Sequence, residues 1–301
     1  MNNNEIHTYI YVTQLICDNR RFEDVYCLNV ENNHNFLITG REFNYLVHNC
    51  EIFQSQQTSI INDSNKEDEL GYDVNCILGS LNIYNVMKNN SIKESVHTAI
   101  EMLTQVSDIS NINNAETVKK ANDLFHSVGL GAMNLHGYLM NNLIPYESEE
   151  AKDFVNVFFM MMNYYSLEKS MLIAKDKETY FYGFNKSEYK NGNYFQQYIS
   201  NDIIPTTEKI SNIFKDVYIP TKNDWIELKN DIQKYGLYNS YRLAIAPTGN
   251  ISYLQNSTQS IMPITQQIEA RISNDKVTYY PMPFLTRDNS LFYKFYSFHF
   301  L

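Results

Sequence analysis

The pattern of apolar residues changes once along this chain of 301 residues, and that change constrains its fold more than any other feature. Up to about residue 49 the sequence reads as short strands, of which TYIYVTQLI and DVYCLNVE are rich in β-branched and aromatic residues. ENNHNFLITG is expected to be a turn followed by an apolar strand, and FNYLVHN is expected to be one more strand. From about residue 94 onward, apolar residues recur at helical spacing, as in KESVHTAIEMLTQVSDI and the long segment that begins EEAKDFVNVFF. RLAIAP and KVTYYPMP are expected to be short buried strands ended by proline. The sequence therefore predicts a small all-β segment followed by a larger α/β domain.

Charge and composition argue against several classes of partner. The formal net charge of −10 is unfavourable for binding nucleic acid or an anionic membrane surface. No apolar run reaches the length of a membrane span, and the N-terminus does not resemble a signal peptide. The cysteines form no CxxC pair, and no Cys or His spacing is typical of a metal site. We therefore expect a cytoplasmic protein that binds no metal, membrane or nucleic acid.

The triplet His48–Asn49–Cys50 stands where the pattern changes. An Asn side-chain amide can attack its own carbonyl carbon, which forms a succinimide and releases the amine of the next residue. His48 suits the proton donor that this step needs, and the Cys50 thiolate suits an acyl acceptor. Taken alone, the triplet is more typical of an ordinary strand end, and only its surroundings favour cleavage chemistry.

The block DVYCLNVENNHNFLITGREFNYLVHNC resembles the C-terminal segment of inteins, the self-splicing protein insertions. Inteins commonly show a VYD-x-x-V strand, an HNF motif, a Gly and a closing aliphatic-His-Asn. The matching residues here are Val25–Tyr26–Cys27, Val30, His34–Asn35–Phe36, Gly40 and Leu46–Val47–His48–Asn49. The resemblance implies an all-β, HINT-like segment over residues 1–49.

The same resemblance implies a role for each splicing residue. His34 would polarise the last peptide bond, His48 would assist cyclisation of Asn49, and Cys50 would begin the flanking protein and accept the transferred chain. Cys27 replaces the Asp of many inteins, and either assists splicing directly or is a buried apolar side chain. Residues 1–24 are too short for the N-terminal intein block. We therefore interpret residues 1–49 as half of a split intein that acts in trans, with a gene fragment or mistaken start codon as the alternative.

Residues 50–289 carry a second set of motifs in a defined order. These are EIFQ (51–54), VNCILGSLNIYNVM (74–87), VGLGAMNLHGYL (128–139), YGLYNSYRLAIAPTGNISYL (235–254) and, more weakly, YYPMPFLT (279–286). They resemble the large, or α, subunit of class I ribonucleotide reductase, closest to its class Ib form. The resemblance implies part of the ten-stranded α/β barrel of that family. Residues 290–301, SLFYKFYSFHFL, match nothing in the family. We interpret them as translation into another interruption of the gene, such as an intron, or as an amphipathic strand.

The reductase resemblance also implies catalytic residues. Glu51 matches the Glu of an Asn-Leu-Cys-x-Glu loop motif, and would accept the proton of the substrate 3′-hydroxyl. Cys50 then takes the variable position of that motif; an alternative alignment makes Cys50 the radical cysteine but leaves Glu51 one residue too close. Cys76 matches one of two redox cysteines. The turn expected to hold the substrate diphosphate comprises Pro247, Thr248, Gly249, Asn250, Ile251 and Ser252.

The motif VGLGAMNLHG is not a dinucleotide fingerprint, because Asn134 replaces the third glycine after Gly129 and Gly131. We interpret the glycines as allowing close helix packing. His126 and His136 receive no role.

The chain is therefore expected to be an internal piece of a ribonucleoside-diphosphate reductase catalytic subunit that is inactive alone. The complete enzyme needs a small β subunit that generates the radical with Mn or Fe, and a thioredoxin- or glutaredoxin-like reductant. The implied splicing partner is an N-terminal reductase half carrying the N-terminal intein half. Two alternatives stay open: an inactive remnant that only binds nucleotide or its partner half, and a self-processing intein with an incidental flanking protein.

Overall fold

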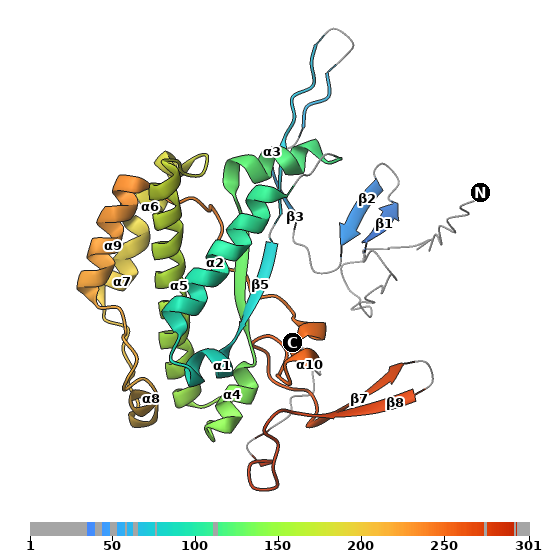
Figure 1. Cartoon of the computed structure of the whole chain (residues 1–301), viewed down its shortest axis with the longest axis vertical. Coiled ribbons are helices and arrows are strands. Elements are labelled where there is room, and N and C mark those ends of the chain that lie inside the picture. The colour runs from blue at the N-terminus through green and yellow to red at the C-terminus, as the bar shows by residue number, and fades with distance from the viewer. Residues whose placement is uncertain are drawn as a thin grey trace, which may run out of the picture. The chain divides into compact units, whose positions relative to one another are not determined.

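The computed structural model describes residues 35–39, 44–48, 53–57, 59–62, 66–75, 77–110, 114–273, 276–291 and 293. The chain divides into two units, residues 1–51 and 52–301 (Figure 1). The strands are β1 Asn35–Thr39, β2 Asn44–His48, β3 Phe53–Gln57, β4 Tyr72–Asn75, β5 Ile77–Asn82, β6 Val128–Met133, β7 Ile268–Ser273 and β8 Lys276–Pro281. The helices are α1 Ile83–Lys88, α2 Ile92–Ile109, α3 Glu116–Phe125, α4 Leu135–Asn141, α5 Glu149–Lys177, α6 Glu188–Asn191, α7 Gln196–Ser200, α8 Glu208–Ile213, α9 Lys222–Tyr235 and α10 Gly249–Leu254, with single 3-10 turns η1 Phe184–Lys186 and η2 Asn193–Phe195.

The first unit contains a β-hairpin. Strands β1 and β2 pair antiparallel, with Asn35 opposite His48 and Thr39 opposite Asn44. Both were predicted as strands, β1 from the apolar run that follows the turn in ENNHNFLITG and β2 from FNYLVHN. The other strands predicted before residue 35 lie outside the described residues.

The second unit is built on three parallel segments. β5 pairs with β6 from Ile77 opposite Val128 to Asn82 opposite Met133. On the other edge of β6, residues 241–245 run parallel to it, joined by hydrogen bonds such as Leu130 N–H to the Arg242 carbonyl at 2.9 Å. Parallel neighbours need long crossover connections, which here contain α2 and α5. Within the described residues the strands do not close on themselves, so the predicted ten-stranded barrel is represented by this part only.

Gly131 in β6 lets residues 241–245 approach closely. A Cβ at Gly131 would lie 2.3 Å from the Ala244 carbonyl oxygen, closer than any side chain tolerates. The prediction that this glycine serves helix packing is therefore wrong: its neighbour is the backbone of the third parallel segment. A glycine is needed because the backbones of two segments approach each other too closely to leave room for a side chain.

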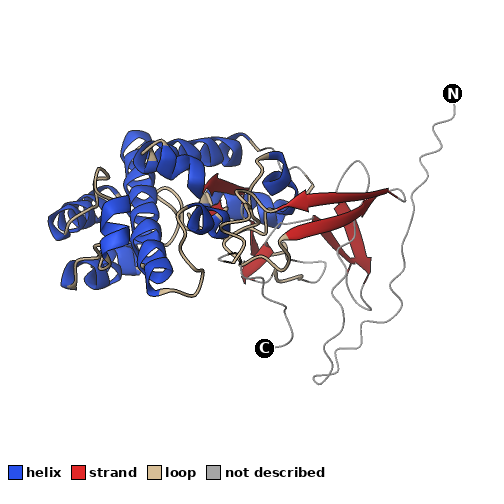
Figure 2. Cartoon of the chain, turned by 90° about the horizontal axis from the view of Figure 1, so that it is seen from below, coloured by secondary structure: helices blue, strands red, loops and turns tan. Residues whose placement is uncertain are grey.

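Helices α2 and α5 pack against one another, and α2 also packs against β5 and β6. Both helices were predicted from helical spacing, and the run Met160–Met161–Met162 is buried in the core as expected. Ion pairs bridge the exposed sides of α2 and α5, joining Lys93 to Glu168, Glu101 to Lys169 and Asp108 to Lys177. Figure 2 shows how much of the second unit is helical. No helix in the described ranges is long and apolar enough to cross a membrane.

Strands β7 and β8 form an antiparallel ribbon that projects from the helical body (Figure 1). The sequence predicted a buried strand over KVTYYPMP, and the strand is present as β8, but it is not buried. Val277 is 49% exposed and Tyr279 is 66% exposed. Tyr280, on the other face, meets the body through the ring of Tyr253, with ring centroids 5.0 Å apart. The prediction of a strand ended by proline is therefore confirmed, and the prediction that the strand is buried is wrong.

The packed body extends beyond the predicted domain end at residue 289. Tyr293 is fully buried in a small cluster with Met140 and Ile264. Its hydroxyl donates to the Pro283 carbonyl at 2.6 Å. The first residues of the predicted tail therefore contribute to the fold; residues 294–301 lie outside the described residues.

His136 in α4 joins this cluster and is fully buried. The Ile264 N–H donates to its Nδ1 at 2.9 Å, and its Nε2 has no hydrogen-bond partner among the described residues. Burial lowers the pKa of His136 to about 4, since the protonated ring would be desolvated. The histidine is thus a neutral core residue.

We expect His136 to make folding stability depend on pH. Its pKa is about 4 in the folded chain and about 6.5 when unfolded, so the stabilisation is complete above pH 6.5 and is lost as the pH falls toward 4. The loss amounts to about 3 kcal/mol at about 1.4 kcal/mol per pKa unit. Urea unfolding at pH 7.5 and pH 4.5 measures it. His136→Asn, which keeps an acceptor, should show a smaller pH dependence than the wild type; an equal dependence would contradict the assignment.

Candidate functional site

The predicted diphosphate turn, residues 247–252, follows the third parallel segment at its C-terminal end and opens α10. Thr248 and Ser252 are buried, whereas Pro247, Asn250 and Ile251 are exposed. A Cβ at Gly249 would meet no atom within 4 Å, so the turn faces open space there. The first backbone N–H groups of a helix have no acceptor within it. Open space and free N–H groups together allow an anion to approach this backbone.

Two asparagines stand at the ends of the neighbouring strands. Asn82 ends β5 and Asn134 follows β6, and the Asn134 Nδ2 donates to the Asn82 Oδ1 at 3.0 Å. Asn134 also holds Thr258, four residues after α10, whose backbone N–H donates to its Oδ1 at 2.9 Å. Sequence reasoning noticed Asn134 only as a missing glycine. Its backbone explains the substitution, because φ is +69° and asparagine tolerates this left-handed region better than most residues.

The predicted catalytic pair is not brought together within the described residues. Glu51 and Cys76 both lie outside them; Cys76 directly precedes β5 in the sequence. Their catalytic roles therefore stay predictions.

The splicing motifs meet through one hairpin. The pairing of Asn35 with His48 and of Phe36 with Val47 brings the last two residues of the HNF motif beside two residues of the closing motif. His48 is the last residue of β2, while Cys27, His34, Asn49 and Cys50 lie outside the described residues. The hairpin register is thus the part of this predicted site that the structure describes.

A second polar cluster lies at the opposite end of β6. The Tyr238 hydroxyl donates to Asp108 Oδ1 at 2.9 Å, and His126 Nδ1 lies 3.4 Å from the same oxygen. Burial lowers the pKa of His126, and the nearby Asp108 opposes this shift. Lys177 pairs with the other carboxylate oxygen of Asp108 at 2.9 Å. The cluster joins α2, α5 and the chain before β6, and the His126 Nδ1 makes no hydrogen bond within the described residues.

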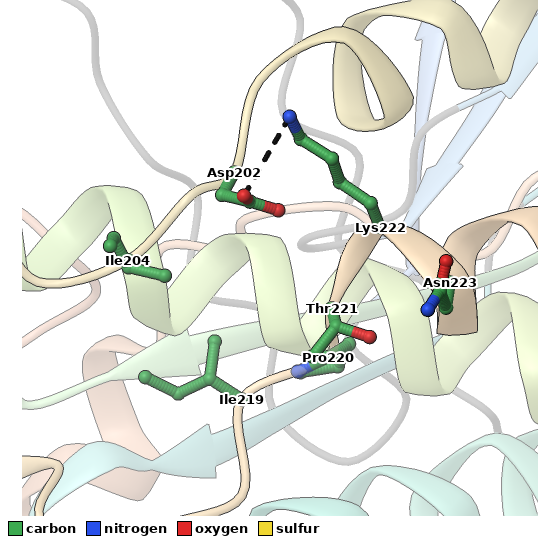
Figure 3. A pocket seen from close by; sticks show the side chains of 7 residues that line it. All are labelled: Asp202, Ile204, Ile219, Pro220, Thr221, Lys222 and Asn223. Carbon is green, nitrogen blue, oxygen red and sulfur yellow. Dashed lines mark ion pairs between the residues drawn. The ribbon is translucent and has the colours of Figure 1, made fainter.

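Figure 3 shows a surface cleft that contains none of the predicted site residues. Lys222 and Asp202 form an ion pair across it at 3.6 Å. The Thr221 backbone N–H donates to the Asp224 carboxylate, and the Asp224 backbone N–H donates to the Thr221 Oγ1, which together form the capping box that begins α9. The polar groups of this cleft are therefore explained by the start of a helix.

The family model for the barrel domain of ribonucleotide reductase matches residues 48–289. The chain is 51% identical over 273 residues to the ribonucleoside-diphosphate reductase NrdEB subunit alpha of Bacillus subtilis (strain 168), covering 90% of this chain and 25% of that protein. It is 51% identical over 244 residues to the ribonucleoside-diphosphate reductase subunit alpha of the same organism, covering 81% of this chain and 35% of that protein. The corresponding subunit of Mycoplasma pneumoniae is 42% identical over 233 residues, covering 75% and 32%.

Two facts follow from these coverages. The chain spans only between 25% and 35% of the length of these three relatives. The alignment to the NrdEB subunit leaves one tenth of this chain unmatched, which is fewer residues than the number that precede residue 48. Part of the segment before the barrel match is therefore also similar to that relative.

We expect Gly249→Val to leave the fold intact but weaken the binding of a nucleoside diphosphate. The valine side chain would enter open space, where an approaching phosphate would meet it. Thermal unfolding and calorimetric titration with ADP measure the two effects. Gly131→Val is the matched control for stability. Its valine side chain would collide with the Ala244 carbonyl, so this variant should lose the folded structure that Gly249→Val keeps. Wild-type affinity for ADP in Gly249→Val would exclude the turn as the phosphate contact.

Proposed function

Because this chain belongs to the ribonucleotide reductase barrel-domain family, we propose that residues 50–289 form part of the catalytic α subunit of a class Ib enzyme. The observation that carries the proposal is the turn at residues 247–252, which ends a parallel segment inside the matched region and faces open space. There it would hold the diphosphate of a ribonucleoside diphosphate. The other parts of the relatives would have to be supplied before turnover, since this chain spans a minor share of their length.

In the proposed chemistry two residues of this chain, Glu51 and Cys76, have different roles. A cysteine thiyl radical outside this chain would remove the 3′ hydrogen of the ribose and later return it. Glu51 would accept the 3′-hydroxyl proton. Cys76 and a second cysteine outside this chain would supply two electrons and two protons, the 2′-hydroxyl would leave as water, and the two cysteines would end as a disulfide.

The proposed enzyme needs three partners. A small β subunit with Mn or Fe would generate the radical, and a thioredoxin- or glutaredoxin-like protein would reduce the disulfide by thiol exchange. An N-terminal reductase half would provide the radical cysteine and the second redox cysteine. The complete enzyme would act in the cytoplasm on ribonucleoside diphosphates.

We further propose that residues 1–49 are the C-terminal segment of an intein, joined to the reductase at Asn49 and Cys50. The hairpin register, which sets the HNF motif beside the closing motif, supports this proposal. So does the similarity of part of this segment to the NrdEB relative. His34 and His48 would assist attack of the Asn49 side-chain amide on its own carbonyl carbon, and Cys50, with help from Cys27, would serve the transfer.

The first prediction for this function concerns splicing. Mixed with a chain that carries the N-terminal intein half, this chain should lose residues 1–49 and be joined at Cys50. Asn49→Ala should block release of the C-terminal piece, because alanine cannot form a succinimide. Asn44→Ala, at the other end of β2, is the control and should splice. Mass spectrometry under reducing conditions measures the products. Intact chains alone in the wild-type mixture would contradict the intein proposal and favour an inactive remnant.

The second prediction concerns turnover in the reconstituted enzyme. Glu51→Gln should lower the rate by roughly 10² to 10⁴, because the amide cannot accept the 3′-hydroxyl proton. Cys76→Ser should start the radical chemistry but fail at reduction, so base should be released from the nucleotide. Neither change should weaken ADP binding greatly. Steady-state reduction of a ribonucleoside diphosphate, with affinity measured separately, tests both; substantial activity in Cys76→Ser would remove its redox role.

A further inference from the structure

The turn at residues 247–252 holds an unfavourable backbone conformation. Thr248 has φ +55°, and Ser260, which contacts it, has φ +50°. A β-branched residue rarely enters this region, and such strain persists only when surrounding structure enforces it. Contacts from residues outside the turn must therefore keep Thr248 in this conformation.

The segment 257–260 holds both ends of the turn. The Ser260 N–H donates to the Thr248 Oγ1 at 2.7 Å. The Ser257 N–H donates to the Ser252 carbonyl at 2.9 Å, and the Ser257 hydroxyl donates to the same oxygen at 3.1 Å. The shape of the turn thus depends on where residues 257–260 lie.

Asn134 in turn fixes this segment through Thr258. The Asn134 N–H donates to the Thr258 carbonyl at 3.0 Å, and the Thr258 N–H donates to the Asn134 Oδ1 at 2.9 Å. The Gly137 N–H adds a bond to the Thr258 Oγ1 at 3.2 Å. A Cβ at Gly137 would lie 2.2 Å from the Asn134 Oδ1, so this glycine leaves room for the carboxamide.

Asn82 completes the connection to the sheet. Its Oδ1 accepts from the Asn134 Nδ2 at 3.0 Å and from the Tyr84 N–H at 3.2 Å. Its own Nδ2 donates to the Gln255 Oε1, just after α10, at 3.1 Å. Asn82 and Asn134 are 8% and 1% exposed, so water competes little for these bonds. The ends of β5 and β6 are therefore joined to the loop that shapes the turn.

Asparagine is suited to position 134 on three grounds. Its carboxamide accepts hydrogen bonds from Thr258 and donates one to Asn82, and its backbone tolerates positive φ. Aspartate keeps the acceptor but not the donor, glycine keeps the conformation but neither bond, and alanine keeps none of them. The three substitutions therefore separate the contributions.

We propose that Asn134, oriented by Asn82, is the positioning residue that sets the shape of the phosphate-binding turn. It does not touch substrate; it acts through Thr258, Ser260 and Thr248. This inference rests on the proposed function, in which the turn holds the diphosphate.

The first test compares ADP with adenosine on the full chain by calorimetric titration. A merely structural role would lower both affinities together, whereas a positioning role lowers the preference for ADP over adenosine. We expect at least a tenfold loss of this preference in Asn134→Ala and in Asn134→Gly, and a smaller loss in Asn134→Asp. Asn82→Ala should reduce the preference, while Asn82→Asp, which keeps the acceptor for Asn134, should restore it. The Asn82 variants keep the proposal testable if the Asn134 variants fail to fold.

The matched control is Asn122→Ala. Asn122 is also a buried asparagine with two hydrogen bonds, both to Ser107, and it lies in α3. Its loss should lower the unfolding temperature without changing the preference for ADP. A fall in preference equal to that of Asn134→Ala would overturn the positioning role.

Hydrogen exchange tests the structural step separately. The amides of Ser257 and Ser260 should exchange at least tenfold faster in Asn134→Gly but not in Asn122→Ala. Unchanged exchange, or faster exchange with an unchanged ADP preference, would overturn the positioning role while leaving the proposed function standing. Equal binding of ADP and adenosine by the wild type would instead overturn the phosphate-binding turn itself, and the positioning role with it.

Discussion

The second unit depends on the double-sided pairing of β6. All six of its residues are buried, so its backbone N–H and C=O groups need partners on both edges. β5 supplies one edge and residues 241–245 supply the other, and both run parallel to β6. The crossover helices, the close contact at Gly131 and the common end at which Asn82, Asn134 and the turn meet all follow from this arrangement.

Local patterns predicted α2 and α5, because helical spacing of apolar residues can be recognised within a short stretch of sequence. Helical spacing predicted segments 93–109 and 149–176, and the structure has α2 at Ile92–Ile109 and α5 at Glu149–Lys177. The exposure of β8 was not predictable in the same way. A short strand rich in β-branched and aromatic residues has the same sequence whether other elements cover it or not, so Tyr279 carries no local sign of its exposure.

The candidate site was predictable in part. The turn at residues 247–252 was identified by its resemblance to a family motif, and it lies where a parallel segment ends. The link from Asn82 through Asn134 to Thr258 was not, because these residues are far apart in sequence and follow no period. The sequence contained one sign of it. Asn134 occupies the position of the third glycine in a dinucleotide fingerprint, and both asparagine and glycine are used where φ is positive. The role of Asn134 can be recognised only once the hydrogen-bond partners of its carboxamide are known.

The choice of threonine at position 248 shows how strain and anchorage are linked. Glycine would adopt φ +55° at lower cost, but it has no hydroxyl to accept the Ser260 N–H. Threonine is strained at this φ, but its hydroxyl accepts the Ser260 N–H. The strained residue is therefore held in place by its own side chain. The turn is consequently ordered when the chain folds. A ligand that binds to an ordered turn causes little further loss of conformational entropy in the turn. More of the free energy of the contacts therefore contributes to affinity.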